Sequence, residues 1–149
     1  MELKKKALGL LSILLVAVLL TGCGQASLKD KIVGAWDNKE FVDSMGLSEL
    51  GVAAPKDTWV EFTKDGKMQI MADGKELKVY IEEALKAAGS EKETIDTLLL
   101  ILPEFTYKVN GDKLTLTFGE ESQEMQTELE GDKLSITEGE TTTVFVKRK

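Results

Sequence analysis

Histidine is missing from this chain of 149 residues, and cysteine occurs only once. Without histidine, the chain lacks the commonest general base of catalytic triads and the commonest ligand for transition metals. A single cysteine excludes an intramolecular disulfide framework and the thiolate clusters that hold zinc or iron–sulfur centres. No Gly-x-Ser-x-Gly, Ser-x-x-Lys, Walker or dinucleotide-binding motif is present either. The sequence therefore predicts a protein that is not an enzyme and that carries no metal or cofactor.

Positive charge is also scarce, because 19 Lys and Arg stand against 26 Asp and Glu, which gives a net charge of −7. This balance argues against nucleic acid as a partner and against electrostatic binding to anionic lipid headgroups. The neighbouring carboxylates Glu82–Glu83 and Glu120–Glu121 have no motif of acid–base catalysis around them, so we interpret them as solvated surface charge. The acidic turns at Asp65, Asp112 and Asp132 lack the ligand spacing of a calcium loop.

The longest apolar run lies at the N-terminus, where residues 7–20 follow Lys4–Lys6 and precede Leu20-Thr21-Gly22-Cys23. Cations, an apolar block and small residues follow the plan of a secretion signal, and the block is shorter than the roughly 20 residues of a membrane-spanning helix. The Leu-small-small-Cys ending resembles the lipobox of bacterial lipoproteins. That resemblance implies a signal peptide at residues 1–22 and a diacylglyceryl group on Cys23, which becomes the mature N-terminus.

This interpretation places the mature protein outside the cytosol, attached to the bacterial cell membrane through Cys23. Two acyl chains give stable attachment, whereas a single chain binds only marginally. Residues 23–30 would form the acylated cysteine and a polar tether, and residues 31–149 would form one domain. An ordinary signal peptide with Cys23 merely nearby is the alternative. Gly24 after the cysteine provides no inner-membrane retention cue, so the sequence leaves open which membrane holds the anchor.

Alternation of apolar and polar residues predicts a mainly β domain. Asp65-Gly66 is a typical tight hairpin turn between two predicted strands. The predicted strands or strand-forming runs cover residues 32–37, 59–63, 67–71, 105–109, 114–118, 125–129, 134–136 and 144–146. Residues 38–57 carry glycines and a proline and predict a long loop, with one helical turn near Ser48.

Residues 76–102 interrupt the strands with a different period. From Leu77 to Ala88 the apolar residues recur at spacings of three and four, which predicts a helix that ends at Gly89. Ser90 and Glu93 match the capping box of a second helix, which Pro103 would stop. The sequence therefore predicts a two-helix hairpin inserted between strands three and four.

An internal repeat connects residues 107–120 with residues 127–140 at a spacing of twenty residues. Asp112-Lys113-Leu114 recurs as Asp132-Lys133-Leu134, and each copy is one strand-turn-strand unit. Repeated hairpins with one apolar face form antiparallel meanders, and closure removes their exposed edges. We therefore expect an eight-stranded antiparallel barrel, a size whose interior holds side chains or one small ligand.

Gly34-Ala35-Trp36 on the first strand, with a basic residue at the end of the last strand, resembles the lipocalin and wider calycin pattern. The chain is also similar to uncharacterised lipocalin-like domains of small bacterial lipoproteins. The resemblance implies that Gly34, Trp36 and Arg148 close one end of the barrel, with the Arg148 guanidinium over the Trp36 indole. Val144 and Val146 share the parity of Arg148, so we expect all three to point inward. The inserted helices depart from the lipocalin pattern.

Leu98–Leu102 is the most apolar run after residue 22 and must contact the barrel, a ligand, a partner or the membrane. One hypothesis makes the helical hairpin a lid over an apolar cavity; the other simply packs it against the barrel. The candidate ligand-binding residues are Met68, Ile70, Tyr80, Leu85, Ile95, Leu99, Tyr107, Leu116 and Met125.

Two functions fit these observations. The first is a non-catalytic binding module for a small apolar or amphipathic ligand. The alternative is a cell-envelope protein-protein interaction module, in which a filled barrel is a scaffold and the helices or residues 40–57 bind another protein. Hydrolysis of an envelope polymer is a remote third option. An interior pocket large enough for a ligand would favour the first function over the second.

Overall fold

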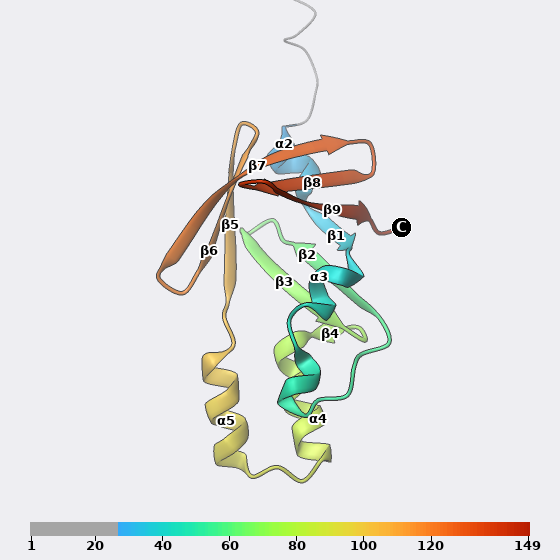
Figure 1. Cartoon of the computed structure of the whole chain (residues 1–149), viewed down its shortest axis with the longest axis vertical. Coiled ribbons are helices and arrows are strands. Elements are labelled where there is room, and N and C mark those ends of the chain that lie inside the picture. Colours follow the sequence, from blue (N-terminus) through green and yellow to red (C-terminus); the bar gives the residue numbers. More distant parts are fainter. Residues whose placement is uncertain (1–26) are drawn as a thin grey trace, which may run out of the picture.

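The structure, a computed structural model, describes residues 27–149, so the predictions for the signal peptide and for Cys23 lie outside the described residues. Eight antiparallel strands close into a barrel, since β9 pairs back with β1 (Figure 1). The barrel strands are β1 (Gly34–Asp37), β2 (Thr58–Phe62), β3 (Lys67–Ala72), β5 (Phe105–Asn110), β6 (Lys113–Phe118), β7 (Glu121–Glu130), β8 (Lys133–Glu138) and β9 (Thr141–Lys147). The prediction of a mainly β chain with an eight-stranded antiparallel barrel is confirmed.

Helices lie at both ends of the barrel (Figure 1). The remaining elements are α2 (Leu28–Ile32), α3 (Lys39–Asp43), the 3₁₀ helix η1 (Leu47–Leu50), the short strand β4 (Lys75–Glu76), α4 (Leu77–Ala87) and α5 (Lys92–Ile101). α2 covers the upper end, where the described chain begins, and α4 and α5 extend from the lower end (Figure 1). In residues 27–149 no helix is both long enough and apolar enough to cross a membrane.

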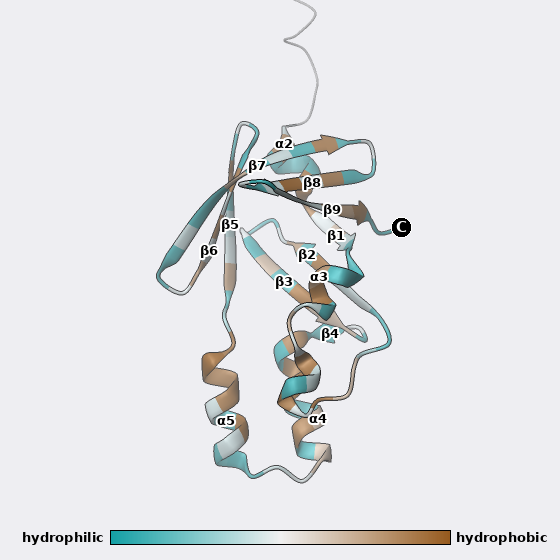
Figure 2. Ribbon diagram, viewed as in Figure 1, coloured by the Kyte–Doolittle hydropathy of each residue, from teal (hydrophilic) through white to brown (hydrophobic). Residues whose placement is uncertain are grey.

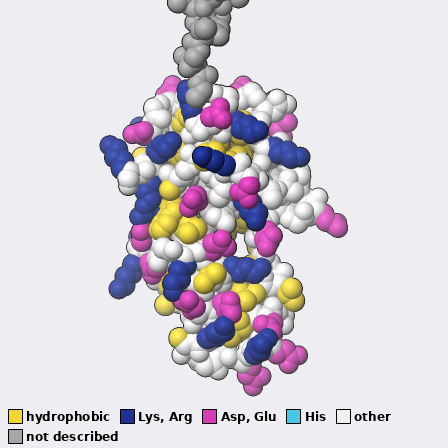
Figure 3. Space-filling view, turned by 180° about the vertical axis from the view of Figure 1, so that it is seen from behind, with side chains coloured by type: hydrophobic (Ala, Val, Ile, Leu, Met, Phe, Trp, Pro, Cys, Tyr) yellow, Lys and Arg dark blue, Asp and Glu magenta, His cyan; other side chains and the backbone are white. Residues whose placement is uncertain are grey.

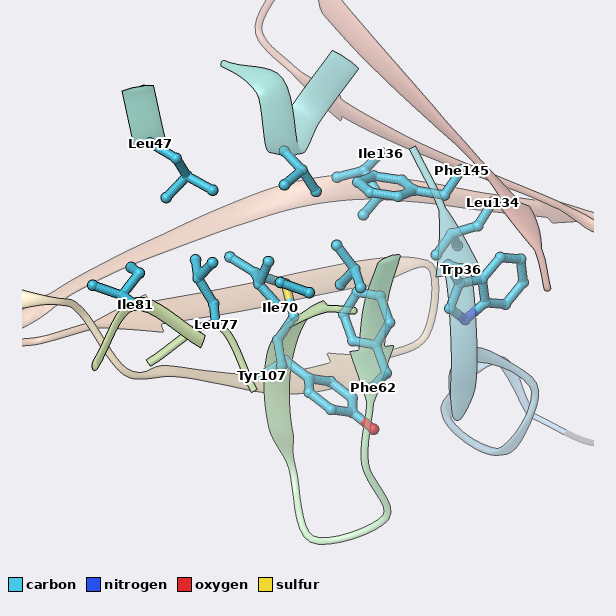
Figure 4. Close-up of a cluster of buried hydrophobic side chains, with 14 of the residues drawn as sticks. Trp36, Leu47, Phe62, Ile70, Leu77, Ile81, Tyr107, Leu134, Ile136 and Phe145 are labelled. Carbon is cyan, nitrogen blue, oxygen red and sulfur yellow. The ribbon is translucent and has the colours of Figure 1, made fainter. Parts of the chain in front are cut away.

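Side chains alternate between the inside and the outside of the barrel along each strand. The pairing register aligns the inward positions, so that Trp36 faces Val60 and Val60 faces Ile70. The buried inward residues are Trp36, Val60, Phe62, Met68, Ile70, Ala72, Tyr107, Leu114, Met125, Thr127, Leu134, Ile136 and Phe145. The apolar members form one cluster that continues into Leu77 and Ile81 of α4 (Figure 4). The interior of the barrel is therefore occupied by its own side chains.

The twenty-residue repeat has a matching hydrogen-bond geometry. The Thr127 N–H donates to the Asp112 carbonyl at 2.7 Å, and the Lys147 N–H donates to the Asp132 carbonyl at 2.7 Å. Both turns place a glycine in the left-handed region, which L-residues with a Cβ adopt only with strain. Hydroxyl pairs also recur across the two hairpins, at Thr117–Ser122 and Thr137–Thr142. The repeat in sequence is therefore a repeat in structure.

The segment before β1 differs from its prediction. Residues 28–30, expected in the tether, belong to α2, and Ile32, expected in a strand, ends that helix. The Ile32 side chain is fully buried, and its carbonyl accepts a 2.7 Å hydrogen bond from Nε1–H of Trp36. Because this bond joins residues four apart, the apolar run before Trp36 turns back onto the barrel end instead of extending.

The capping box predicted for α5 does not form. The N-cap of α5 is Glu91, which makes no side-chain capping bond. Ser90 instead completes the end of α4: its N–H donates to the Leu85 carbonyl at 3.0 Å, and Gly89 adopts a φ of 78°. This is the Schellman arrangement that often ends a helix with glycine. The backbone of Ser90 therefore belongs to the end of α4, and α5 begins one residue later than the capping box predicts.

The predicted contact between Arg148 and Trp36 is wrong. Lys147 Nζ lies 5.3 Å from the centroid of the Trp36 ring, whereas the Arg148 guanidinium lies 4.2 Å from the centroid of the Trp59 ring. Trp36 pairs directly with Lys147 across the sheet, and Phe145 is the buried residue of β9. Lys147 therefore shares the inward face of Phe145, and Arg148 lies outside.

Arg148 still joins β9 to the strands beside it. Its backbone N–H donates to the Ala35 carbonyl at 2.9 Å, and its guanidinium contacts both Asp37, at 3.2 Å, and Asp57. The hydrogen bond that the guanidinium donates to the Asp57 carboxylate is the main cause that raises the pKa of Arg148. Val144 and Val146, expected inward, are 45% and 46% exposed.

Candidate functional site

The ladder between β3 and β5, beside the inserted helices, is as short as the β1–β9 ladder and shorter than the other ladders of the barrel wall, and we call this junction the β3–β5 seam. Two residue pairs join the strands, Lys67 with Thr106 and Met68 with Phe105. By contrast, six residue pairs join β5 to β6. The part of β3 after Met68 therefore runs on without β5 as its neighbour.

Pro103 explains why the ladder stops. Each step forward along β3 corresponds to one step back along β5, so a longer ladder would place Pro103 opposite Ile70. Proline has no backbone N–H and cannot donate to a ladder. Further along, β3 pairs instead with the short strand β4. The wall is consequently open beside Gln69 and Ile70.

A pocket of about 170 Å³ lies at this opening, and we call it the seam pocket. Its apolar lining consists of Met45, Met68, Ile70, Leu77, Leu102, Pro103 and Phe105. Its polar lining consists of Lys67, Gln69, Glu76, Lys78, Glu104 and Thr106. These residues come from β3, from the end of β4 and the start of α4, and from the link between α5 and β5 together with the start of β5 (Figure 1), with Met45 added from the loop after α3.

The apolar lining is held by the core of the barrel. Met68, Ile70 and Leu77 are buried, and they belong to the same cluster as Phe62 and Tyr107 (Figure 4). The ring of Phe105, which is half-buried, lies 6.2 Å from that of Phe118 on the neighbouring strand. Methionine side chains adapt readily to apolar ligands of different shape. The core cluster therefore holds part of the apolar lining in place, while the methionine side chains of the lining can adapt to a ligand.

The polar lining carries two lysines and two glutamates, so its formal charges balance. Lys78 Nζ lies 3.9 Å from a carboxylate oxygen of Glu104, and the Gln69 amide donates to Glu76 at 2.7 Å. Both contacts are exposed, and an exposed ion pair such as Lys78–Glu104 contributes about 0–1 kcal/mol. The pocket thus presents an apolar interior beneath a polar, neutral surround, which suits an apolar or amphipathic molecule better than an ion.

The structure distributes the nine candidate ligand-binding residues over several places. Met68 and Ile70 line the seam pocket, whereas the other seven do not. Those seven are Tyr107, Leu116 and Met125 on inward positions of the barrel and Tyr80, Leu85, Ile95 and Leu99 on the two long helices. Tyr80 donates its hydroxyl to the Ala53 carbonyl at 3.0 Å. The structure therefore does not gather these nine side chains around one central cavity.

Sequence reasoning missed Leu77, Leu102 and Phe105 as pocket residues. The sequence pattern places Leu77 at the start of a helix, Leu102 at the end of the apolar run Leu98–Leu102 and Phe105 on a strand, and none of these assignments indicates a pocket. Pro103 gave the one available signal, because a proline at the start of a strand also limits the ladder that the strand can form. The sequence alone does not show which strand would face it.

Exposed apolar side chains occur at the end of α5. Leu100 and Ile101, in the last turn of α5, are 85% and 68% exposed, and Leu102 follows them in the chain. Figure 2 shows that the hydrophobic part of α5 is the end that leads into β5. Figure 3, which shows the molecule from behind, has apolar side chains among charged ones on the lower part of that face. Of the run Leu98–Leu102, the remaining three members pack partly on the core.

Two further polar groups lie inside the barrel. The Tyr107 hydroxyl donates to the Thr63 carbonyl at 2.6 Å, and its ring lies edge-on to Phe62 with centroids 5.0 Å apart. Burial, followed by the charge of Asp65, raises the pKa of Tyr107. Thr127 is buried, and its Oγ1 makes no hydrogen bond to any of the described residues. Tyr107 is a satisfied core residue, whereas Thr127 carries an unpaired hydroxyl.

The fold and the seam pocket define a closed antiparallel β-barrel with an apolar recess in its wall. Comparisons of the chain with models of protein families, with curated proteins and with solved structures gave no match. The chemistry of the pocket, together with the sequence patterns, is therefore what supports a function.

Proposed function

We propose that this protein is a non-catalytic binding module for a small apolar or amphipathic ligand, anchored outside the cytosol to the bacterial cell membrane by a diacylglyceryl group on Cys23. The observation that carries the binding proposal is the seam pocket, an apolar recess of about 170 Å³ in the barrel wall. The lipobox pattern that ends at Cys23 supports the location. The resemblance to lipocalin-like domains of bacterial lipoproteins agrees with both parts.

The seam pocket has the features of a small-molecule site. Such sites are concave and mainly apolar, with a few polar groups that orient the ligand. An engineered apolar cavity of about 150 Å³ in another protein binds benzene, so the seam pocket has room for a group of similar size.

The ligand would enter from the side of the barrel and not through its end. In a lipocalin-like calyx the ligand occupies the interior, but here Trp36, Phe62 and Leu114 are fully buried within it. α2 covers one end, and the inserted helices extend from the other (Figure 1). The opening lies instead in the wall, at the β3–β5 seam, where Pro103 stops the ladder.

The alternative is a cell-envelope interaction module, and two observations favour it. The filled barrel could act as a scaffold, and Leu100 and Ile101 expose apolar surface that a protein partner could cover. We rank this alternative second because the surface is small, whereas stable interfaces bury about 800 Å² on each partner. Neither function requires a chemical step.

Binding is tested with the chain expressed from residue 23 with Cys23→Ser, by native mass spectrometry and by calorimetric titration of small apolar compounds. Leu102→Trp should fill the pocket and weaken binding at least about tenfold, a loss of about 1.4 kcal/mol. Val146→Trp is the matched control, because Val146 is exposed on β9 and does not line the pocket. The absence of any bound compound in the parent protein, even at millimolar concentration, would leave the interaction module as the better description.

Membrane attachment is tested separately with the full chain in a bacterial host. Cys23→Ser should move the protein out of the membrane fraction, since a single cysteine carries the proposed lipid. Mass spectrometry of the mature N-terminus should find the mass of the lipid on Cys23 and the loss of residues 1–22. An unmodified cysteine in the mature protein would refute the anchor without affecting the binding proposal.

A further inference from the structure

The first part of β9 has a free edge. β9 pairs with β8 from Thr141 to Val146, whereas β1 pairs with only Val146 and Lys147, beside the end of the strand (Figure 1). In the part of the chain that the structure describes, residues 141–145 therefore have no strand on the β1 side. We call this stretch the β9 edge.

The hydrogen bonds at the end of β9 show which backbone groups this edge presents. In an antiparallel strand the N–H and C=O of one residue point to the same side, and successive residues alternate between the two sides. The Arg148 N–H donates to a carbonyl of β1, whereas the Lys147 N–H donates to the turn before β8. Thr142 and Val144 share the parity of Arg148, so they direct their N–H and C=O groups away from β8.

Of these backbone groups, the described residues provide a partner for one. The Val144 carbonyl accepts a hydrogen bond from the side-chain amide of Asn38 at 2.9 Å, in the place of a donor from a neighbouring strand. The Thr142 N–H, the Thr142 carbonyl and the Val144 N–H have no strand beside them, and both side chains are exposed. Unpaired ladder groups of this kind are a template for the addition of another strand.

A groove runs between the β9 edge and α3. It is lined by Thr141–Val144 of β9 and by Asn38, Lys39, Glu40, Phe41 and Ser44. Asn38 holds its two sides together, because Oδ1 accepts a 2.8 Å hydrogen bond from the Phe41 N–H while the amide contacts Val144. The half-buried Phe41 ring lies 5.6 Å from that of Phe145 and gives the groove an apolar contact. α3 therefore lies beside the edge without covering it.

The hairpin twenty residues earlier has a free edge of the same kind. The ladder between β7 and β8 begins at Gln126, so residues 121–125 of β7 have no strand of the described chain on the β8 side. Ser122 is the equivalent of Thr142, and each forms a hydroxyl pair across its hairpin. The internal repeat therefore provides a second edge for comparison.

The two edges differ in charge. Glu121 and Glu124 on β7 occupy the positions that Thr141 and Val144 have on β9. Charged side chains are a common protection of free edges against the addition of a strand. Residues 141–145 carry no charge, and α3 contributes one lysine and one glutamate to the groove, which balance. The β9 edge thus lacks the protection that its counterpart on β7 has.

A second copy of this chain fits the β9 edge poorly. Two β9 strands related by a twofold axis would overlap over Thr141–Thr143 at most, because the turn at residues 139–140 ends the strand on one side and Asn38 and β1 occupy the other. A separate extended segment has no turn of its own at this place. Thr141–Val144 are all β-branched, and such residues pair well with β-branched residues of a neighbouring strand.

We propose that the β9 edge binds an extended segment of another protein, which adds as a strand beside Thr142 and Val144. The backbone of the segment pairs with the free groups of these two residues. Its side chains, uncharged and mainly β-branched, lie along Thr141–Val144 and against Phe41. This interaction goes beyond the proposed function and is separate from the seam pocket, whose lining shares no residue with the groove.

The probe is the neutral peptide Gln-Thr-Val-Thr-Val-Thr-Gln, acetylated and amidated, titrated into the chain from residue 23 with Cys23→Ser. Nuclear magnetic resonance should show saturable shifts and slower hydrogen exchange of the Thr142 and Val144 amides. Thr142→Pro removes a donor from the free side and no bond to β8, so it should weaken binding at least about tenfold. Ser122→Pro makes the same change on β7 and should leave binding unchanged.

A second variant keeps the test decisive where Thr142→Pro does not fold. Thr141→Glu/Val144→Glu transfers the charges of the β7 edge to β9 with the backbone unchanged, and should also weaken binding at least about tenfold. N-methylation of the peptide, one residue at a time, removes its backbone donors in turn. It should weaken binding at every second position, because a strand directs alternate N–H groups to its neighbour.

The absence of a saturable shift at Thr142 and Val144 with millimolar peptide would overturn the proposal. Equal binding by wild type and the folded variants would do the same, as would binding that tolerates N-methylation at every position. Self-association that is lost in Thr141→Glu/Val144→Glu would assign the edge to a second copy instead. Binding of apolar compounds at the seam pocket should be the same in wild type and in all these variants, so this proposal and the proposed function fail independently.

Discussion

Thr127 carries a hydroxyl where the barrel offers it no partner. Its side chain is 3% exposed and faces Ile136 across the sheet, and Oγ1 has no hydrogen bond within residues 27–149. A buried polar group without a partner costs about 1–3 kcal/mol. Valine has nearly the same shape, so Thr127→Val should raise the free energy of unfolding by about 1 kcal/mol or more, measured by urea denaturation.

Thr143→Val is the control for this substitution, because Thr143 also faces inward but is only half-buried. It should change the free energy of unfolding by less than about 0.5 kcal/mol. Loss of stability in Thr127→Val would show that the hydroxyl has a partner, such as a buried water molecule, and would refute the orphan assignment.

Tyr107 gives the barrel a dependence on alkaline pH. Because burial raises its pKa above the ordinary 10.0, the folded protein keeps the phenolic proton to a higher pH than the unfolded chain does. Its contribution to stability is therefore complete below about pH 10 and is lost as the pH rises through the folded-state pKa. Tyr107→Phe should lower the free energy of unfolding by about 1 kcal/mol near neutral pH, because the hydrogen bond to Thr63 is lost.

The measurement is denaturant unfolding of both proteins at about pH 8 and about pH 11, on either side of the reference pKa. The stability difference between wild type and Tyr107→Phe should shrink at the higher pH, since only the wild type has a phenol to ionise. A difference that stays constant between the two pH values would contradict the raised pKa.

The hardest feature to predict from sequence was which residues of β9 face the inside of the barrel. In β9, Val144, Phe145 and Val146 are all apolar, so alternation alone cannot show which face is buried. The choice was decided by the size of the side chains: the aromatic ring fills the core, and the two valines remain outside. Lys147 follows Phe145 in parity and so reaches Trp36 in place of Arg148.

At the scale of elements, local signals predicted much of the fold. Glycine turns, the hairpin at Asp65-Gly66 and the repeat at a spacing of twenty residues indicated the strands near where the structure has them. Helix boundaries were less certain, since Ser90 suits both the start of α5 and the end of α4. The decisive factor is the left-handed backbone of Gly89, with a φ of 78°, which directs the Ser90 N–H back to α4.

The opening at the β3–β5 seam follows from one residue, and Pro103→Val should close it. Valine supplies the N–H that proline lacks, so the ladder can continue opposite Ile70 and reduce the pocket. We expect binding of small apolar compounds to weaken at least about tenfold, with unfolding free energy unchanged or higher. Titration calorimetry measures the first, and hydrogen exchange of the Ile70 amide and of the new amide at residue 103 reports the longer ladder.

Pro55→Val is the matched control for Pro103→Val, because Pro55 is the other proline of the chain and does not line the pocket. It should leave binding unchanged. Equal binding by Pro103→Val and wild type, with the ladder extended, would show that the opening is not the ligand's route.

At the scale of the molecule, closure of the barrel was predictable and the position of the pocket was not. Repeated hairpins with one apolar face must hide their edges, and that argument needs only the sequence. The pocket depends on how far β3 and β5 pair, and these strands are separated by the whole helical insertion. No local pattern fixes the length of a ladder between such distant segments. For the same reason, the nine expected ligand-binding residues all belong to or pack against one apolar cluster without lining one cavity.

The end of the barrel nearest the proposed anchor depends on α2, and removal of this helix tests how the molecule is closed. Ile32 is fully buried, and its carbonyl is the acceptor for the Trp36 indole N–H. A chain that begins at Val33 would lose this buried side chain, worth about 1.5–3 kcal/mol, and would leave a buried donor unpaired. Its free energy of unfolding should therefore fall by about 3 kcal/mol or more relative to a chain that begins at Ser27, measured by urea denaturation followed by tryptophan fluorescence. The seam pocket lies at β3 and α4 and does not include α2, so the shorter chain should retain binding wherever it remains folded. Equal stability of the two chains would show that the barrel closes without α2 and that the helix belongs to the tether.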